Sequence, residues 1–309
     1  MGPIMQHDGQ TASRDGAWFD AMYNNRALVP DCEQHIQRWV DQSAVARQGV
    51  GTLDLRYGPG LNETLDLFLP RSLVSAPHKT AELMPVVIFV HGGYWRALDK
   101  SAQSFIAPAF THPHDMAHPE CLVVVPNYAL CPAVTIPDIV MQMVRCVAWV
   151  HDHVASYGGD SRQIILMGHS AGGQLVAQLL NCDWQSVSPH LPPTLTRKAL
   201  SISGLFDLEP IMQAPFLQTD LRLTPEQVAK VSPAWQPAPS DACLYSVVGG
   251  DESAEFLRQN RLIQQVWGPH GVPVCESLAG LNHFSILSAL CEPQHRLHQL
   301  AWELIQKSP

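Results

Sequence analysis

The sequence predicts an α/β fold, in which helices flank a doubly wound, mostly parallel sheet. Three observations lead to this prediction. Short, mostly apolar runs lie at 85–95, 121–128, 163–170, 198–207, 242–253 and 272–283. Continuous apolar runs are typical of strands that are covered on both faces. Helical stretches separate several of these runs, which indicates βαβ crossovers, and reactive or polar residues follow four of them.

The N-terminal part of the chain is expected to be helical and then to form a hairpin. Apolar residues recur at helical spacing in 17–48, largely after Pro30. Between 52 and 70, apolar and polar residues alternate on either side of Gly-Pro-Gly, which is a hairpin signal. We therefore treat 1–50 as an N-terminal helical extension.

The rest of the chain alternates between the predicted strands and helices. Helical stretches are expected at 135–158, 171–181 and 252–271. The Pro-rich segment 186–197 and the segment 209–241 interrupt this alternation, and they are interpreted as loops or as a cap over the sheet. The chain has no internal repeat or long linker, so we expect one domain, 1–309.

Composition limits the partners. The 309 residues are 46% hydrophobic and only 15% charged, which fits a large buried core. A net charge of −9 argues against binding to nucleic acid, which needs a basic face. The chain has no apolar stretch of about 20 residues that could cross a membrane, and its polar start argues against a secretory signal. Eight scattered Cys without a CxxC pair predict reduced thiols and a cytoplasmic location.

Ser170 stands in a motif typical of serine nucleophiles. The stretch GHSAG (168–172) follows the apolar run IILM and precedes a helical stretch. Its glycines let the backbone turn too tightly for a Cβ, so the Ser hydroxyl stands clear of the sheet. The next helix places its positive N-terminal end beneath a developing oxyanion. We therefore predict a catalytic Ser170; the alternative is a strand–helix turn that merely contains Ser.

A Ser nucleophile needs a base, and the base needs an acid that orients it. His283 follows the last apolar run and is the predicted base, although a structural His in a loop is the alternative. Asp251, in a Gly-Gly turn after the previous run, is the predicted acid. Glu252 is its nearest rival and Asp207 a weaker one. Ser, Asp and His in this order along the chain match the order known for this Ser motif.

The turn HGGYW (91–95) follows the first apolar run and completes the predicted site. Ligands of doubly wound sheets lie beyond the carboxyl ends of the strands, where all these residues fall. We predict an oxyanion hole formed by backbone N–H groups of Gly92, Gly93, Tyr94 and Ala171. Tyr94 and Trp95 are expected to line the substrate pocket; the alternative is a tight turn with its aromatic side chains in the core.

Other kinds of site have less support. His112, His114 and His118 have a spacing that could hold a metal, but they lie in a polar, Pro-rich loop where surface histidines are expected. The sequence has no GxGxxG or P-loop pattern. We therefore expect no metal and no cofactor.

Taken together, HGGYW, GHSAGG, SGLFDL and the NHF stretch resemble the α/β-hydrolase superfamily, and within it the kynurenine formamidase (arylformamidase) family and related bacterial esterases. The likeness runs from about residue 17, with YNNRALVPD, to the C-terminus. It implies a Ser-His-Asp acyl hydrolase that uses no cofactor, with Ser170, Asp251 and His283 as its triad. HGGYW is the motif that favours a formamidase.

Three functions remain open. The first is a serine acyl hydrolase that cleaves an N-formyl aryl amine, such as N-formylkynurenine, through an acyl-enzyme intermediate. The second is a carboxylesterase of small acyl esters or lactones, which would differ only in its pocket. The third is a non-catalytic binding protein of the same fold, which would be expected to lack a triad member. The expected partner is a small-molecule substrate, and a homodimer is a hypothesis that the sequence does not test.

Overall fold

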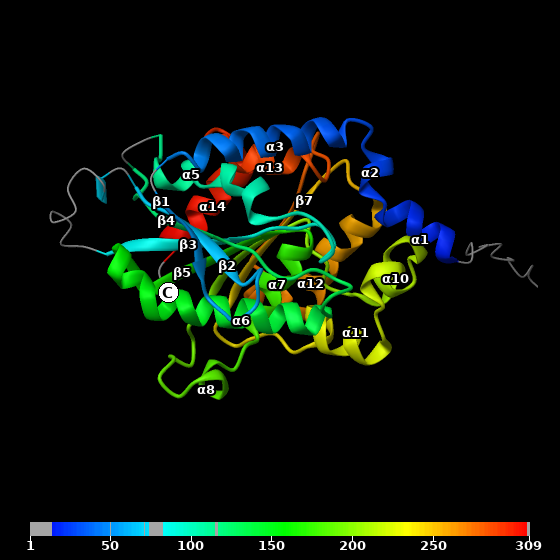
Figure 1. Cartoon of the computed structure of the whole chain (residues 1–309). Helices are drawn as coiled ribbons and strands as arrows, with labels where there is room; N and C mark the ends of the chain where they lie inside the picture. The colour runs from blue at the N-terminus through cyan, green and yellow to red at the C-terminus, as the bar shows by residue number, and fades with distance from the viewer. Residues whose placement is uncertain (1–13, 50, 71, 74–82, 115–116, 308–309) are drawn as a thin grey trace, which may run out of the picture.

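A computed structural model describes residues 14–49, 51–70, 72–73, 83–114 and 117–307, and these form one sheet with helices on both faces (Figure 1). The described strands pair in the order β1-β2-β4-β3-β5-β6-β7-β8. β1, β2 and β4 are antiparallel neighbours, and every other pair is parallel. The strands are β1 (Gly51–Arg56), β2 (Thr64–Phe68), β3 (Met84–Val90), β4 (Leu122–Pro126), β5 (Gly159–His169), β6 (Lys198–Ile202), β7 (Cys243–Gly249) and β8 (Val274–Leu278).

Helices follow most of the strands. Those of eight or more residues are α1 (Gly16–Tyr23), α3 (Cys32–Ala46), α6 (Ile136–His153), α7 (Ala171–Leu180), α12 (Ala254–Gly271) and α14 (Arg296–Gln306). The shorter ones are α2 (Asn25–Leu28), α5 (Pro108–Thr111), α8 (Trp184–Val187), α9 (Glu209–Met212), α10 (Pro215–Leu221), α11 (Pro225–Val231) and α13 (Ser285–Leu290). Single 3₁₀ turns are η1 (Lys100–Ala102), η2 (Ser104–Ile106), η3 (Val154–Tyr157) and η4 (Pro233–Trp235).

The continuous apolar runs are explained by burial on both faces of the sheet. In β3, Val86 and Ile88 pack into the core on the side of α6 and α7, whereas Val87 and Phe89 pack into the core on the side of α14. All four side chains are buried, because helices cover both faces of the central strands. The predicted fold class and the predicted hairpin at 52–70 are confirmed.

The N-terminal extension is helical over more of its length than the sequence pattern indicated. α1 and α2 precede Pro30, where no clear helical spacing is seen. Each begins at a side-chain cap: Asp15 accepts a hydrogen bond from the N–H of Trp18 at 2.9 Å, and Asn24 accepts one from Ala27. Such caps stabilise helices that are too short to be read from periodicity. Residues 1–13 lie outside the described part of the chain.

The segment 209–241 is also largely helical, and it lies at the same end of the molecule as the N-terminal helices. It contains α9, α10, α11 and η4. α10 packs against α1, and Figure 1 shows the two side by side. Residues of α2 and α10 lie near Ser170, which follows the carboxyl end of β5.

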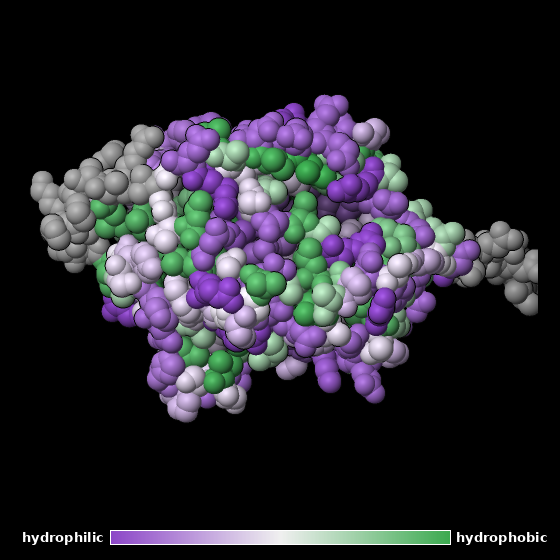
Figure 2. Space-filling model, viewed as in Figure 1, coloured by the Kyte–Doolittle hydropathy of each residue, from purple (hydrophilic) through white to green (hydrophobic). Residues whose placement is uncertain are grey.

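The outer side of α3 is polar. Figure 2 shows hydrophilic residues along the outer side of α3, whose inner face buries Cys32 and Trp39. Of the helices formed by the described residues, none is long and apolar enough to cross a membrane.

Candidate active site

Ser170 occupies a strained turn between β5 and α7. Its backbone angles are φ 56° and ψ −117°, a conformation that residues with a Cβ rarely adopt. A Cβ on Gly168 would lie 2.2 Å from the carbonyl oxygen of Gly172, and one on Gly172 would lie 2.0 Å from that of Val90. The two glycines of the motif are therefore required for the turn. Strain of this kind costs about 1–3 kcal/mol and is concentrated at functional sites.

The turn that follows β3 packs directly against Ser170. A Cβ on Gly92 would lie 2.8 Å from the carbonyl oxygen of His169 and 3.0 Å from the Cβ of Ser170, so glycine is needed for this close approach. Gly93, at φ 104°, accepts backbone hydrogen bonds from Arg96 and Ala97. This arrangement brings the backbone of the turn beside Ser170, next to the N-terminal end of α7, whose first N–H groups have no partner within the helix.

His91 stiffens this turn. Its ring is buried, stacks on Tyr128 with 4.2 Å between centroids, and its Nδ1 lies 2.8 Å from the carbonyl oxygen of Gly92. Burial lowers the pKa of His91, so the ring is neutral near pH 7. The hydroxyl of Tyr128 donates to the carbonyl of His91 at 2.8 Å. The side chain of His91 thus supports the backbone geometry of the turn.

His283 contacts a buried carboxylate, and that carboxylate belongs to Glu252. The Nδ1 of His283 lies 2.6 Å from Oε2 of Glu252. The other oxygen, Oε1, accepts hydrogen bonds from the backbone N–H of Gly249, at 2.8 Å, and from the hydroxyl of Ser203. Both carboxylate oxygens are therefore fixed, and the imidazole donates through Nδ1.

The prediction that Asp251 orients His283 is wrong. Asp251 is exposed, and its backbone N–H donates to the carbonyl of Leu281 at 3.0 Å. A tight turn, closed by the N–H of Glu252 and the carbonyl of Gly249, places Asp251 at its outer corner and returns Glu252 to the site. Asp207, the weaker rival, lies 3.3 Å from Arg258 instead.

His169, which precedes Ser170, holds the backbone of His283 in place. Its Nε2 lies 2.9 Å from the carbonyl oxygen of His283, and because a carbonyl only accepts, Nε2 carries the proton. Burial and the neighbouring His283 ring keep the pKa of His169 well below its usual range, so His169 is neutral. The ring of Phe256 covers His283 at 4.6 Å between centroids. His283 is therefore held in position from several sides.

Ser170 and His283 line one cavity of about 490 Å³. Its walls come from five parts of the chain: the N-terminal helices, the turn after β3, α10, the segment that carries Ser170 and the segment that carries His283. Trp39 and Phe216 supply aromatic surface, and Arg96 and Asp220 supply charge. Both segments that the sequence singled out, 1–50 and 209–241, thus contribute walls to the site.

Of the two predicted pocket residues, Tyr94 lines this cavity and Trp95 does not. Tyr94 lines it, and its hydroxyl donates to the carbonyl of Tyr23 at 2.6 Å, which joins the turn to α1. Trp95 does not line it: its ring is fully buried, and its Nε1 donates to Gln174 at 3.1 Å. The prediction that Trp95 lines the substrate pocket is therefore wrong, and its ring lies in the core beneath α7.

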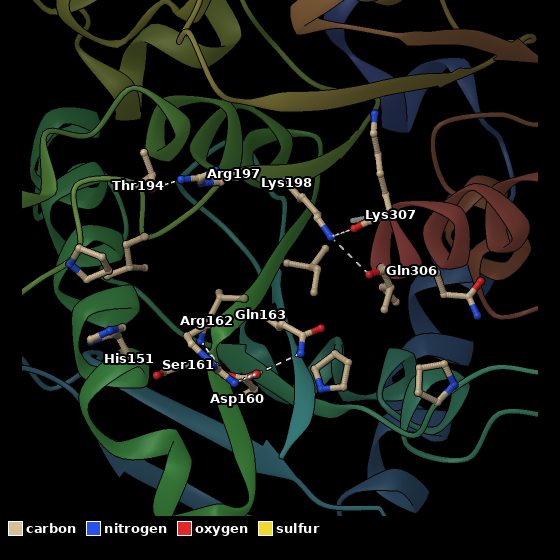
Figure 3. A pocket seen from close by; sticks show the side chains of 17 residues that line it. His151, Asp160, Ser161, Arg162, Gln163, Thr194, Arg197, Lys198, Gln306 and Lys307 are labelled. Atoms are coloured by element: carbon tan, nitrogen blue, oxygen red, sulfur yellow. Dashed lines mark hydrogen bonds and ion pairs between the residues drawn. The ribbon is translucent and has the colours of Figure 1, made fainter. Parts of the chain in front are cut away.

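A second, larger cavity lies at the opposite edge of the sheet, where β5 and β6 begin (Figure 3). Its charged side chains have partners within the protein, and the guanidinium of Arg197 donates to the hydroxyl of Thr194. Arg162 pairs with Asp160, and Lys198 donates to the carbonyls of Ile305 and Lys307 at the end of α14. Because ligands of doubly wound sheets bind at the carboxyl ends of the strands, the cavity with Ser170 is the better candidate for the active site.

The histidine-rich loop does not resemble a metal site in the structure. The ring of His118 stacks on Trp302, and Nδ1 of His112 lies 2.6 Å from the hydroxyl of Thr111. Among the described residues, no group of three or more His, Cys, Asp or Glu could hold a metal ion. Residues 115–116 of this loop lie outside the described part of the chain.

We therefore expect chelators to leave activity unchanged. Incubation with EDTA, followed by desalting, should keep turnover within about 20% of the untreated enzyme, because a serine nucleophile with a histidine base needs no metal ion. Initial rates with phenyl acetate would measure this. Loss of activity that zinc restores would contradict the prediction.

Two family models and several curated proteins are similar to this chain. The BD-FAE family model matches residues 72–186, and the model of the Carboxylesterase family matches 139–245. The chain is 30% identical over 283 residues to kynurenine formamidase of Danio rerio, covering 89% of each chain. It is 27% identical over 254 residues to that of Drosophila melanogaster, covering 78% of this chain and 77% of the relative.

Solved structures share the fold. The crystal structure of a candidate thioesterase from Silicibacter sp. TM1040 superposes with a TM-score of 0.76 at 28% identity, covering 94% of this chain and 99% of the other. An esterase from Pyrobaculum calidifontis superposes with a TM-score of 0.61 at 15% identity, covering 89% of this chain and 93% of the other, which is a likeness of fold alone.

Proposed function

Because the chain belongs to the kynurenine formamidase family, we propose that it is a serine hydrolase that removes the formyl group from an N-formyl aryl amine. That the protein is an α/β-hydrolase-fold hydrolase follows from its relatives and its fold. The proposed mechanism depends on one observation above all: the buried contact of His283 with Glu252, in the cavity that Ser170 also lines. The proposed triad is Ser170, His283 and Glu252.

The first half-reaction forms a formyl-enzyme. The hydroxyl oxygen of Ser170 attacks the formyl carbon while Nε2 of His283 takes the hydroxyl proton. Glu252 stabilises the imidazolium and keeps the other proton on Nδ1, the atom that faces it at 2.6 Å. The bond between carbon and nitrogen then breaks as the imidazolium returns its proton to the aryl amine, which leaves with two hydrogens on its nitrogen.

The second half-reaction releases formate. Water attacks the formyl ester of Ser170 as His283 takes one of its protons. The bond between the formyl carbon and the serine oxygen then breaks as the imidazolium returns that proton to Ser170, and the formic acid released ionises in water. The tetrahedral intermediate of each half carries a negative oxygen, which needs preorganised donors. We assign this role to the N–H of Ala171 and to the backbone of Gly92, Gly93 and Tyr94, because that turn packs against Ser170.

The cavity and the family support the proposed substrate class. A formyl group has only hydrogen beyond its carbonyl, so almost all of the substrate lies on the leaving-group side. The cavity of about 490 Å³ is of the size that proteins use for small ligands. Phe216 and Tyr94 meet edge to face at 6.1 Å between centroids and offer aromatic surface for an aryl ring.

A carboxylesterase is the second candidate, since the Carboxylesterase family model matches 139–245 and esterases share the fold. An added methyl on the acyl group changes transition-state binding by about 1–3 kcal/mol in a pocket of this kind. We therefore expect kcat/KM for N-formylkynurenine to exceed that for phenyl acetate by at least about tenfold. Purified protein and both substrates at pH 7.5 suffice for the measurement. A hundredfold preference for acetyl or butyryl esters over every formamide would favour the carboxylesterase.

A further inference from the structure

A pair of opposite charges lines the candidate active site and takes no part in the proposed chemistry. Arg96 follows the turn after β3, and Asp220 lies near the end of α10. Their side chains form an ion pair in which Nη1 of Arg96 lies 2.6 Å from Oδ2 of Asp220. Both residues line the cavity that holds Ser170 and His283.

The pair is held rigidly but is not closed off. Nη1 of Arg96 also donates to the carbonyl of Phe216 at 2.9 Å, and the guanidinium lies over the ring of Phe216 at 5.4 Å. The side chains of Arg96 and Asp220 remain 25% and 34% exposed. The contacts of Arg96 engage Nη1, which leaves the rest of the guanidinium fork to bind a carboxylate of a ligand.

A fixed cation beside a fixed anion suits a ligand that carries both charges close together. A carboxylate alone would meet the repulsion of Asp220, and an ammonium alone would meet that of Arg96. An α-amino acid presents its carboxylate and its ammonium on one carbon atom, and so it can bind both residues at once. The aromatic surface of Phe216 adjoins the pair, since its ring contacts Tyr94 on one side and Arg96 on another.

We propose that Arg96 and Asp220 bind the α-amino-acid group of the substrate, with the carboxylate on Arg96 and the ammonium on Asp220. This inference rests on the proposed formamidase function and specifies its substrate: an N-formyl aryl amine whose ring carries an amino-acid side chain, as N-formylkynurenine does. The pair would then select for the zwitterion while Phe216 and Tyr94 hold the ring.

The test compares four formamides on one ring: N-formylkynurenine, its analogue without the ammonium, its analogue without the carboxylate, and 2-formamidoacetophenone, which has neither. A charge-assisted hydrogen bond is worth about 10- to 100-fold in binding. We expect Arg96→Gln to lower the ratio of kcat/KM for N-formylkynurenine over 2-formamidoacetophenone by that factor. Asp220→Asn should lower it too, yet raise the ratio for the analogue that has only the carboxylate.

A merely structural role predicts a different pattern. If the pair only anchors α10, each variant should lower kcat/KM for all four formamides alike and leave every ratio unchanged, which would overturn the inference. Arg222→Gln, at the exposed end of α10, is the matched control and should keep the ratios within about threefold. Arg26 also lines the cavity, and loss of the carboxylate preference in Arg26→Gln rather than in Arg96→Gln would equally overturn it.

Failure of the proposed function can be told apart from failure of this inference. Hydrolysis of phenyl acetate without hydrolysis of any formamide would contradict the formamidase alone. Inhibition of phenyl acetate hydrolysis then decides the role of the pair: L-kynurenine should inhibit at least about tenfold more tightly than 2-aminoacetophenone, and Arg96→Gln should abolish the difference. Equal inhibition constants in the unaltered enzyme would overturn the inference.

Discussion

Replacing Ser170 with Ala is expected to remove nearly all turnover and all covalent labelling. Loss of a serine nucleophile lowers kcat by about 10⁶-fold in enzymes that use such a triad. The fold should persist. The strain of the turn lies in the backbone at φ 56°, and the side chain of Ala is smaller than that of Ser, so it adds no steric clash. A fluorophosphonate probe, followed by peptide mapping, should modify Ser170 in the unaltered enzyme and no residue in the variant.

The matched control for this experiment is Ser203→Ala. Ser203 also follows a strand, also has a positive φ of 52°, and donates to Glu252 on the side away from His283. Its loss should remove one hydrogen bond from the carboxylate and lower kcat by only about tenfold, with labelling of Ser170 retained. Labelling that persists in Ser170→Ala, or vanishes in Ser203→Ala, would contradict the assignment of the nucleophile.

The sequence could predict the parts of this site that directly follow the carboxyl ends of strands. Ser170 follows β5, whose last residues are buried, and His283 follows the edge strand β8, which is only partly buried. Parallel strands bring their carboxyl ends to one edge of the sheet, so both residues could be placed there from the sequence. The glycines around Ser170 were informative because close backbone approach leaves no room for a Cβ. Both residues line one cavity, although their catalytic roles remain predictions.

The parts that sequence could not predict depend on the direction of a side chain within a turn. Asp251 and Glu252 are adjacent, and only the hydrogen bond from Glu252 N–H to Gly249 decides which of them turns inward. Trp95 and Tyr94 differ in the same way, since both have positive φ but only one side chain meets the cavity. The walls supplied by Arg96 and Phe216 depend on how α10 packs on α1, which is a tertiary contact without a local signal.

Glu252→Gln is expected to lower kcat by about 10⁴-fold, whereas Asp251→Asn should change it by less than about threefold. Replacing the acid of a comparable triad by its amide lowers kcat by about 10⁴-fold, because the imidazole takes the wrong tautomer. Asp251 is exposed and does not contact His283, so its charge is screened by solvent. Steady-state kinetics on the two variants, with circular dichroism to compare their folds, would measure the difference.

The hydrogen bonds of Glu252 explain why we expect the amide of Glu252→Gln to lower kcat so strongly. Oε1 of Glu252 accepts from Gly249 N–H and from the hydroxyl of Ser203, and a backbone N–H can satisfy only an acceptor. The amide oxygen must therefore stay on that side, which turns the NH₂ group toward Nδ1 of His283. Nδ1 would then accept, and the proton would move to Nε2, which could no longer take the proton of Ser170. Near-full activity in Glu252→Gln together with a large loss in Asp251→Asn would restore the acid that the sequence pattern favoured.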